Sequence, residues 1–441
     1  MLLDFKVKNW QCFRDEIELS MRASKERRCS NSVTRLPKMY GTTKVLPLAA
    51  LYGANASGKT SLFEAISFLR DLIVWGTEID ESIPLSPFAL NSDSPYQPTE
   101  FAIEFLIENR IYRYYIALSR SSVLAESLVK IRTKDEEILF DRTIGQPITI
   151  GDGIKNDSLF FIASNTRANQ LFLHNAVEQN SEEIKPFYDW FRYSLKTISI
   201  GGRYGNYPKM LVDDRFNDFA SRYLSRYNTG ACKLVSKKIE DEDLISKYER
   251  EVLKHFPKEM EDFTGGMQFL SLSPNGNRQI LFIKFENGQF SSLEKLSLEH
   301  KGENDFTTTF DLMEESTGTQ RFVELLPAYF DLLEPPKSDE KSAVYIIDEI
   351  DRSAHSGLIN DLLSQYINNY MPESGRQLIF TAHDTSLMDA SFMRKDEVWL
   401  LSKQRESGSS TLSRIGCSNG ARSDNNLEKL YRKGNYGGLP V

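Results

Sequence analysis

A glycine-rich stretch near the start of the chain constrains the fold more than any other feature. Residues 53–60 read Gly-Ala-Asn-Ala-Ser-Gly-Lys-Thr and match the phosphate-binding P-loop at every fixed position. An apolar run, 48–52, precedes this stretch, and a helical pattern, 61–69, follows it. A P-loop requires this strand–loop–helix order, because the helix N-terminus and successive backbone N–H groups bind phosphate oxygens. The sequence therefore predicts an α/β fold that binds ATP, against the alternative of a Gly/Ser-rich turn without a ligand.

The fixed positions of this loop assign a task to each residue. Lys59 is expected to reach the β- and γ-phosphates, and the Thr60 hydroxyl to coordinate Mg²⁺. ATP and Mg²⁺ are thus the predicted cofactors. The other residues predicted to contact the nucleotide from this loop are Gly53, Asn55, Ala56, Ser57, Gly58 and Ser61.

A second group of candidate residues lies near the end of the chain. The β-branched run 343–347 is typical of a buried parallel strand, and it ends in Asp348-Glu349. Asp348 is predicted to hold Mg²⁺ through water, and Glu349 to polarise the attacking water. The alternative is a pair of solvated loop carboxylates. Another strand-like run, 376–381, ends just before His383.

A small hydroxyl and glycine turn, Ser316-Thr317-Gly318-Thr319-Gln320, precedes an apolar helical pattern at 321–330. Such a turn can bind an anion through the N–H groups that open the helix. The alternative is an ordinary capped helix start, since Ser or Thr followed by Gln is capping-box chemistry. The position of the turn between the P-loop and the acidic pair favours Ser316 and Gly318 as nucleotide contacts. A nucleotide kinase would leave this turn unexplained.

These motifs, in this order, resemble the head of ABC-type ATPases, in which a histidine at the position of His383 senses the γ-phosphate. The chain looks like the soluble branch that contains RecF, SMC heads and OLD-like ATPases, because residues 1–15 resemble its opening strand and Asp351 follows the acidic pair as it often does there. The resemblance implies a mostly parallel core sheet, an antiparallel subsheet and a helical insertion. It also implies that Ser316 and Gly318 of one subunit complete the P-loop site of another. A homo-oligomer, either a dimer or a larger ring, follows from that geometry.

The closing segment 431–440 resembles the tail of bacterial AAA-labelled, ABC-like ATPases. Many of these belong to two-gene phage-defence modules, such as the PARIS and AbiL-type systems. The resemblance implies an ATPase that acts as a sensor or scaffold for a separate effector protein, a nuclease, and that responds to a viral protein. The residues after His383 contain no Asp-x-Asp pair for two-metal chemistry, so we expect no intrinsic nuclease domain.

Two departures from the family pattern affect the expected rate. The turn at 316–320 differs from the transporter form Leu-Ser-Gly-Gly-Gln, and the glutamine loop has only Asn165 and Gln170 as candidates. ATP hydrolysis is therefore expected to be slow or to depend on a partner. Asn9 and Phe13 are candidates for contacts to the adenine.

Composition limits the class of protein further. The four cysteines lie far apart without metal-binding spacing, which fits a reduced, cytoplasmic compartment and not structural zinc. No apolar run approaches the length of a membrane span. The net charge of −8 disfavours indiscriminate wrapping of DNA. A basic segment nevertheless favours an alternative function, a RecF- or SMC-like clamp that binds DNA when ATP is bound. Its residues are Arg22, Lys25, Arg27, Arg28, Arg35 and Lys38.

Three regions are expected along the chain. Residues 1–165 would form the N-terminal ATPase lobe, with the P-loop and a strand meander at 101–107, 111–118 and 122–131. Residues 166–275 would form a helical insertion or lid, because segments such as 214–227 have helical spacing and dense mixed charge. Residues 276–441 would form the C-terminal ATPase lobe.

Overall fold

The chain folds into two compact units in the computed structural model. Unit 1 comprises Met1–Ile200, Pro335–Asp351 and Ile359–Val441, and unit 2 comprises Gly201–Glu334 and Arg352–Leu358. The structure describes residues 1–26, 32–133, 135–199, 211, 213–227, 229–246, 250, 268–272, 281–286, 289–335, 342–389, 391–415 and 427–432.

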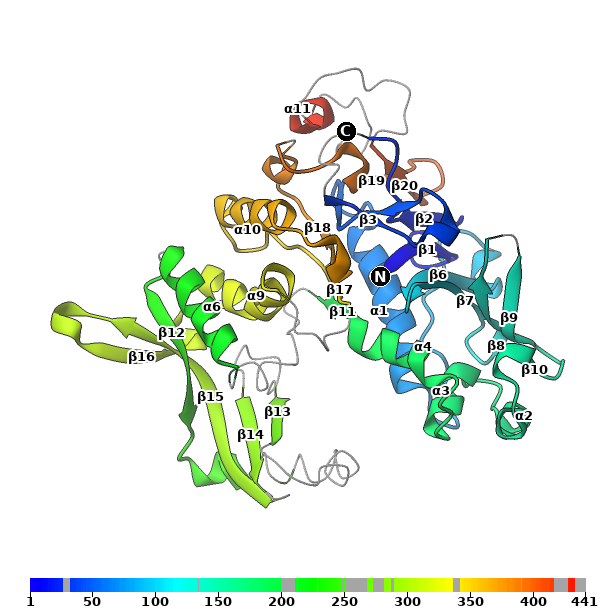
Figure 1. Ribbon diagram of the computed structural model, residues 1–441, viewed down its shortest axis with the longest axis horizontal. Helices are drawn as coiled ribbons and strands as arrows, with labels where there is room; N and C mark the ends of the chain where they lie inside the picture. Colours follow the sequence, from blue (N-terminus) through cyan, green and yellow to red (C-terminus); the bar gives the residue numbers. More distant parts are fainter. Residues whose placement is uncertain are drawn as a thin grey trace. The chain divides into compact units, whose positions relative to one another are not determined.

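The core sheet of unit 1 has the strand order β11-β17-β18-β5-β19-β20 (Figure 1). Its strands are β11 (Leu195–Ile198), β17 (Val344–Ile347), β18 (Gln377–Thr381), β5 (Leu48–Gly53), β19 (Val398–Lys403) and β20 (Ser410–Arg414). Neighbouring strands from β11 to β19 run parallel, and only the outer pair β19–β20 is antiparallel. Every residue of β17 and β18 is buried, as a parallel strand covered on both faces requires. The predicted mostly parallel core sheet is confirmed.

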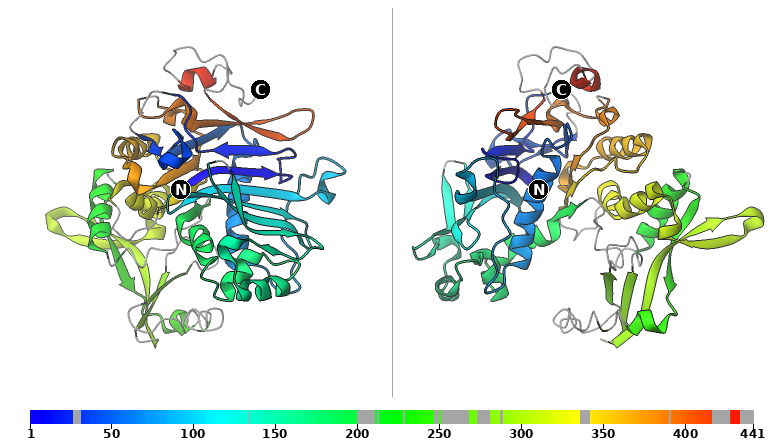
Figure 2. Two further views of the ribbon diagram at one scale, coloured as in Figure 1. Left: turned by 45° about the vertical axis from the view of Figure 1, so that its right-hand side comes forward. Right: turned by 180° about the vertical axis from the view of Figure 1, so that it is seen from behind.

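An antiparallel sheet of order β10-β9-β8-β7-β6-β1-β2 completes the strand architecture of unit 1, and its strands lie side by side in Figure 2. They are β1 (Leu2–Lys8), β2 (Ile17–Ser20), β6 (Thr99–Ile107), β7 (Arg110–Leu118), β8 (Val123–Ile131), β9 (Glu136–Thr143) and β10 (Thr149–Ile150); a small pair, β3 (Thr34–Arg35) and β4 (Lys44–Val45), lies apart from it. Phe101, Ile103 and Phe105 alternate along β6 and are buried, which gives the sheet its core face. The predicted strand meander is confirmed.

Helix α1 (Lys59–Trp75) begins directly at the end of the P-loop. Its buried residues include Leu62, Ile66, Leu69 and Ile73, which recur with helical spacing and belong to the main core of unit 1. The other helices of unit 1 are α2 (Asp157–Asn165), α3 (Phe172–Glu178), α4 (Lys185–Asp189) and α11 (Leu427–Arg432), and α10 (Ser356–Asn368) begins within the last residues of the 352–358 segment.

Unit 2 combines helices with a sheet of order β12-β15-β14-β13, in which β16 also pairs with β15. The elements are α6 (Asp214–Arg226), β12 (Ala231–Lys238), β13 (Gln268–Leu272), β14 (Leu281–Glu286), β15 (Gln289–Lys301), β16 (Thr307–Asp311) and α9 (Thr317–Leu333). Phe330 of α9 packs against Phe216 and Phe219 of α6, with ring centroids 5.4 and 5.5 Å apart. The helix expected at 214–227 is thus present.

The division of the chain differs from the three predicted regions. Residues 166–200 belong to unit 1, because α3 contributes Phe172 and Leu173 to its core and β11 pairs with β17. The expected insertion at 166–275 is not purely helical, since it also contains the strands β12 and β13. The turn at 316–320 belongs to unit 2 and not to the C-terminal ATPase lobe.

Two sequence features lie largely outside the described residues. Only Tyr431 and Arg432 of the closing segment 431–440 are described, and Arg27 and Arg28 of the basic segment are not. Among the described helices, none combines the length and the apolar character that crossing a bilayer needs.

We expect Gly53→Ala to destabilise unit 1. A Cβ at this position would contact the Ser57 hydroxyl and lie 2.5 Å from the backbone oxygen of Leu401, which belongs to a paired strand and cannot retreat. Overpacking of this kind costs about 1–3 kcal/mol. Urea denaturation of the two proteins would measure the difference, and equal midpoints would contradict the tight fit. Gly302→Ala is the control, because its φ of −97° suits alanine and a Cβ there meets nothing closer than 3.5 Å.

Candidate functional site

The P-loop leaves strand β5 and enters helix α1 through two residues with left-handed backbone. Ala56 has φ 60° and Gly58 has φ 108°. A Cβ at Gly58 would lie 2.6 Å from Sγ of Cys12 and 3.1 Å from the ring of Phe13. The turn after β1 therefore packs directly against the loop, and only glycine fits both the space and the backbone conformation.

Lys59 points back across the loop that precedes it. Its Nζ donates to the backbone oxygens of Gly53 and Ala54, at 2.7 and 3.3 Å. Burial lowers the pKa of this ammonium, and the nearby carboxylates of Glu349 and Asp348 oppose that change. The cation is thus held where the loop curves, the place expected for a lysine that binds phosphate.

The acidic pair lies at the end of β17 and is tied to the neighbouring strand by one hydroxyl. Oγ1 of Thr381, the last residue of β18, donates to Oδ1 of Asp348 at 2.5 Å. The same oxygen accepts from the backbone N–H of Glu349 at 2.7 Å. Burial raises the pKa of Asp348, while hydrogen bonds from Thr381 and Thr60 lower it. Asp348 therefore lies between the metal-binding hydroxyl expected from the sequence and a fixed donor.

His383 faces the second acid of the pair. Its Nε2 lies 3.2 Å from Oε1 of Glu349. Glu349 itself has a left-handed backbone, φ 47°, so the chain turns sharply where β17 ends. Because β17, β18 and β5 are parallel neighbours, their carboxyl ends meet at one edge of the sheet. Lys59, Thr60, Asp348, Glu349 and His383 are accordingly brought together in unit 1.

The remaining P-loop candidates lie along the same loop. Asn55, Ala56 and Thr60 are exposed, whereas the Ser57 side chain is buried and its Oγ has no hydrogen-bond partner among the described residues. Ser61 uses its backbone oxygen to accept from Nε1 of Trp10 at 3.0 Å, which fixes the first turn of α1 to the turn after β1.

Three weaker candidates have other contacts. The Asn9 side chain donates to three backbone oxygens between residues 94 and 98 and accepts from the N–H of Phe88, so it holds a turn. Gln170 is buried and donates to Glu178. The side-chain amide of Asn165 donates to the backbone oxygen of Phe161 on its own helix.

Ser316 and Gly318 open helix α9 in unit 2. The Ser316 hydroxyl accepts from the N–H of Thr319 at 3.1 Å, so Ser316 is the N-cap of this 17-residue helix. A Cβ at Gly318 would lie 2.7 Å from the backbone oxygen of Ser353. The turn thus caps the helix, as its capping chemistry indicated, and this leaves its predicted contact with a nucleotide untested.

The residues of unit 1 fit ATP and Mg²⁺. The loop needs glycine at positions 53 and 58, and its buried Ser57 hydroxyl has no hydrogen-bond partner among the described residues. The ammonium of Lys59 lies against the backbone of the same loop. The hydroxyl of Thr60 beside the carboxylate of Asp348 is an oxygen pair of the type that Mg²⁺ prefers. Mg²⁺ would supply neutralisation of the phosphate charge there.

Fold and site define a P-loop protein of the AAA/ABC-type ATPase class. The model of the family described as "AAA domain, putative AbiEii toxin, Type IV TA system" matches residues 48–389, so the chain belongs to this family. No curated protein matches the sequence. Among solved structures, the SMC head domain from Thermotoga maritima is similar at 12% identity and a TM-score of 0.37, over 94% of this chain and 98% of that one. A likeness of this size carries no argument about function.

Thr381 is the residue of this site that the sequence did not single out. Thr381 is buried, and its hydroxyl oxygen donates to the Asp348 carboxylate and accepts from the backbone N–H of Glu349. The sequence signal that could have indicated Thr381 is a hydroxyl at the last position of a buried apolar strand, two residues before His383.

We expect Thr381→Val to weaken both the fold and the site. Valine has nearly the same shape but leaves Asp348 without this donor and the N–H of Glu349 without its acceptor, at a cost of about 1–3 kcal/mol. The free energy of unfolding and the Mg²⁺ concentration for half-maximal turnover would both be measured. Thr381→Ser keeps the hydroxyl and is the control. Equal behaviour of Val and Ser would show that the hydroxyl does not matter.

Proposed function

We propose that this chain binds Mg²⁺-ATP at the P-loop of unit 1 and hydrolyses it. The observation that carries the proposal is the meeting of Lys59, the Thr60–Asp348 pair and the Glu349–His383 pair at the carboxyl ends of three adjacent parallel strands. An arrangement of a cation, metal-binding oxygens and a second carboxylate meets the needs of phosphoryl transfer to water.

Each side chain has a distinct task in this proposal. Lys59 stabilises the negative charge of the β- and γ-phosphates, and Thr60 with Asp348 orients the metal. Glu349 takes the proton from the attacking water, because its carboxylate is the one that His383 faces, whereas Asp348 lies beside the Thr60 hydroxyl. His383 holds the Glu349 carboxylate through Nε2 and lies where it could also meet the γ-phosphate.

We further propose that two or more copies share each ATP site. Ser316 and Gly318 would approach the γ-phosphate of a neighbouring copy with the N–H groups that open α9, since a helix N-terminus favours anions. The chain would then assemble as a dimer or ring when ATP is bound and loosen on hydrolysis. This part rests on the resemblance to ABC-type heads.

The proposed biological task is control of a separate effector in antiphage defence, in the manner of the PARIS and AbiL-type modules. The family description, which names a toxin and a toxin–antitoxin system, supports a module of two proteins. The effector would be a nuclease on another chain, released or activated when a viral protein meets the ATPase assembly.

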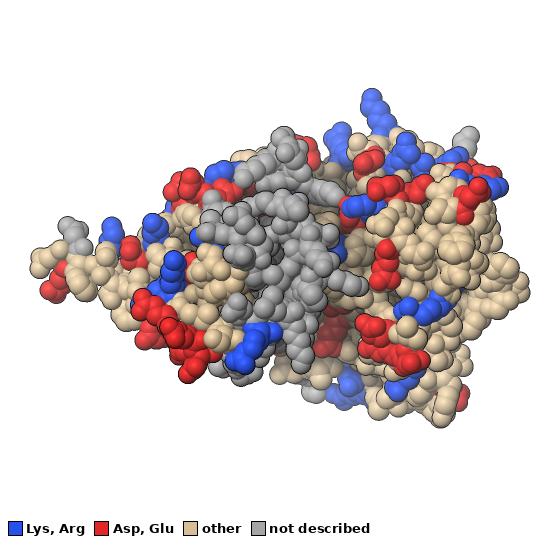
Figure 3. Space-filling view, turned by 90° about the horizontal axis from the view of Figure 1, so that it is seen from below, with Lys and Arg blue, Asp and Glu red and all other residues tan. Residues whose placement is uncertain are grey.

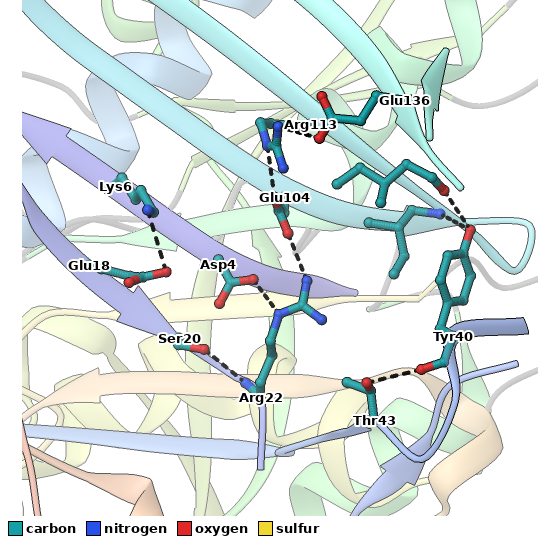
Figure 4. A network of polar contacts seen from close by, with 12 residues as sticks. Asp4, Lys6, Glu18, Ser20, Arg22, Tyr40, Thr43, Glu104, Arg113 and Glu136 are labelled. Atoms are coloured by element: carbon teal, nitrogen blue, oxygen red, sulfur yellow. Dashed lines mark hydrogen bonds and ion pairs between the residues drawn. The ribbon is translucent and has the colours of Figure 1, made fainter. Parts of the chain in front are cut away.

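The basic segment gives little support to a DNA clamp. Arg22 pairs with Asp4 and Glu104, at 2.6 and 2.7 Å, and Glu104 also binds Arg113 (Figure 4). This arginine is therefore neutralised within the antiparallel sheet. On the face drawn in Figure 3, basic and acidic side chains of the described residues are interspersed. A phosphate backbone would need a continuous basic track.

The first test compares ATP turnover and ATP binding in the wild type, Lys59→Ala and Glu349→Gln. Lys59→Ala should lose both, because the phosphates lose their cation. Glu349→Gln should lose turnover by about 100-fold or more, within the range of general-base catalysis, and retain bound ATP. Light scattering with ATP should give a multimer for Glu349→Gln. Turnover that survives Glu349→Gln would refute the proposed chemistry.

The second test asks whether sites are shared between copies. Ser316→Asp retains a residue that caps a helix well but places a negative charge at the turn, so it should bind ATP without turnover. Mixing this variant with Lys59→Ala should restore part of the wild-type turnover, because a mixed pair contains one intact composite site. A mixture as inactive as its components would contradict sharing, and Ser316→Thr is the neutral control.

A further inference from the structure

Asp351 joins the acidic turn after β17 to the histidine segment after β18. Its Oδ2 accepts from the backbone N–H of His383 at 2.8 Å and from that of Asp384 at 2.6 Å. Two backbone donors on one charged oxygen make a strong, directional attachment. The attachment fixes the backbone at the residue whose side chain faces Glu349.

The contacts around Glu349 then form a closed series. Thr381 holds the Glu349 backbone, and His383 meets its carboxylate. The backbone of His383 is in turn held by Asp351, which lies two residues after Glu349. A backbone contact between Ile350 N–H and the Thr381 oxygen, 3.0 Å, runs between the same two segments. The two strand ends are thus linked on both sides of the catalytic carboxylate.

Asp351 is half-buried. Its other oxygen, Oδ1, is shielded from solvent and accepts no hydrogen bond within the described part of the chain. Tyr52, buried at the end of β5, has a pKa well above its usual value because of burial and the charges of Asp351 and Asp384. Asp351 also acts electrostatically on Lys59. The carboxylate therefore lies beside the loop without a direct hydrogen bond to it.

We propose that Asp351 is a positioning residue for hydrolysis: by holding the amides of His383 and Asp384, it places Nε2 of His383 against Glu349. The inference rests on the proposed ATPase function and adds a residue to it. Asp351 itself contacts neither phosphate nor metal in this arrangement. Its contribution is the geometry of the base, which affects the rate of the chemical step more than ATP binding.

Two substitutions of Asp351 distinguish its role as a hydrogen-bond acceptor from the effect of its negative charge. Since a single oxygen accepts both amides, the carboxamide oxygen of Asp351→Asn can replace it, whereas Asp351→Ala has no acceptor. Asp351→Ala should lower kcat by about 100-fold, the cost of misplacing a reacting group by an ångström, with an unchanged KM. Asp351→Asn should recover most of that loss. Asp389→Ala is the matched control, because among the described residues its carboxylate binds a nearby loop N–H, that of Ser391 at 2.8 Å, and no group of the site.

A second measurement does not depend on turnover. Hydrogen exchange at the amides of His383 and Asp384 should become fast in Asp351→Ala and stay slow in Asp351→Asn, with other peptides unchanged. Should the wild type hydrolyse no ATP, the proposed function fails while this readout still tests the attachment. Wild-type exchange or wild-type kcat in Asp351→Ala overturns the inference. Equal loss in Ala and Asn also overturns it, because charge would then matter and not the acceptor.

Discussion

The parallel pairing of β17, β18 and β5 is the constraint on which the rest of the site depends. Register places Ile347 opposite Phe380, and Thr381 opposite Leu51, so the strands end almost level. Side chains separated by about three hundred residues in the sequence therefore meet at one edge. A shift of one residue would turn Thr381 away from the acids, since neighbouring side chains of a strand face opposite sides.

Polar contacts at that edge are local and mutually dependent. The Thr381 hydroxyl bonds to the Asp348 carboxylate and to the backbone N–H of Glu349. The Asp351 carboxylate accepts from two backbone amides, and the imidazole of His383 contacts the Glu349 carboxylate. Where the contacts are buried, as between Thr381 and Asp348, an unmet donor or acceptor is costly, so this part of the network tends to keep a single arrangement. Preorganisation of this kind is what phosphoryl transfer asks of a protein, because positioning and charge supply most of its catalysis.

The P-loop and the buried strands β17 and β18 could be predicted because their signals are contiguous. A fixed pattern of glycines or a run of β-branched residues needs no partner to be recognised. The contacts of Thr381 and Asp351 could not, since a hydroxyl or carboxylate acquires its partners only when two distant strands pair. The strands β12 and β13 inside the expected insertion could not be predicted for a similar reason. Mixed charge at 214–227 gives a clear helical pattern, whereas β12 to β16 combine through long-range pairing.

The packing of Phe13 against Gly58 links the start of the chain to its phosphate loop. Phe13 is fully buried, and its ring occupies the space that any larger residue at position 58 would need. The residues at these two positions therefore constrain one another physically. Trimming the Phe13 ring would open a void beside the loop and still not admit a larger residue at position 58, because a Cβ there would lie 2.6 Å from Sγ of Cys12 on a left-handed backbone.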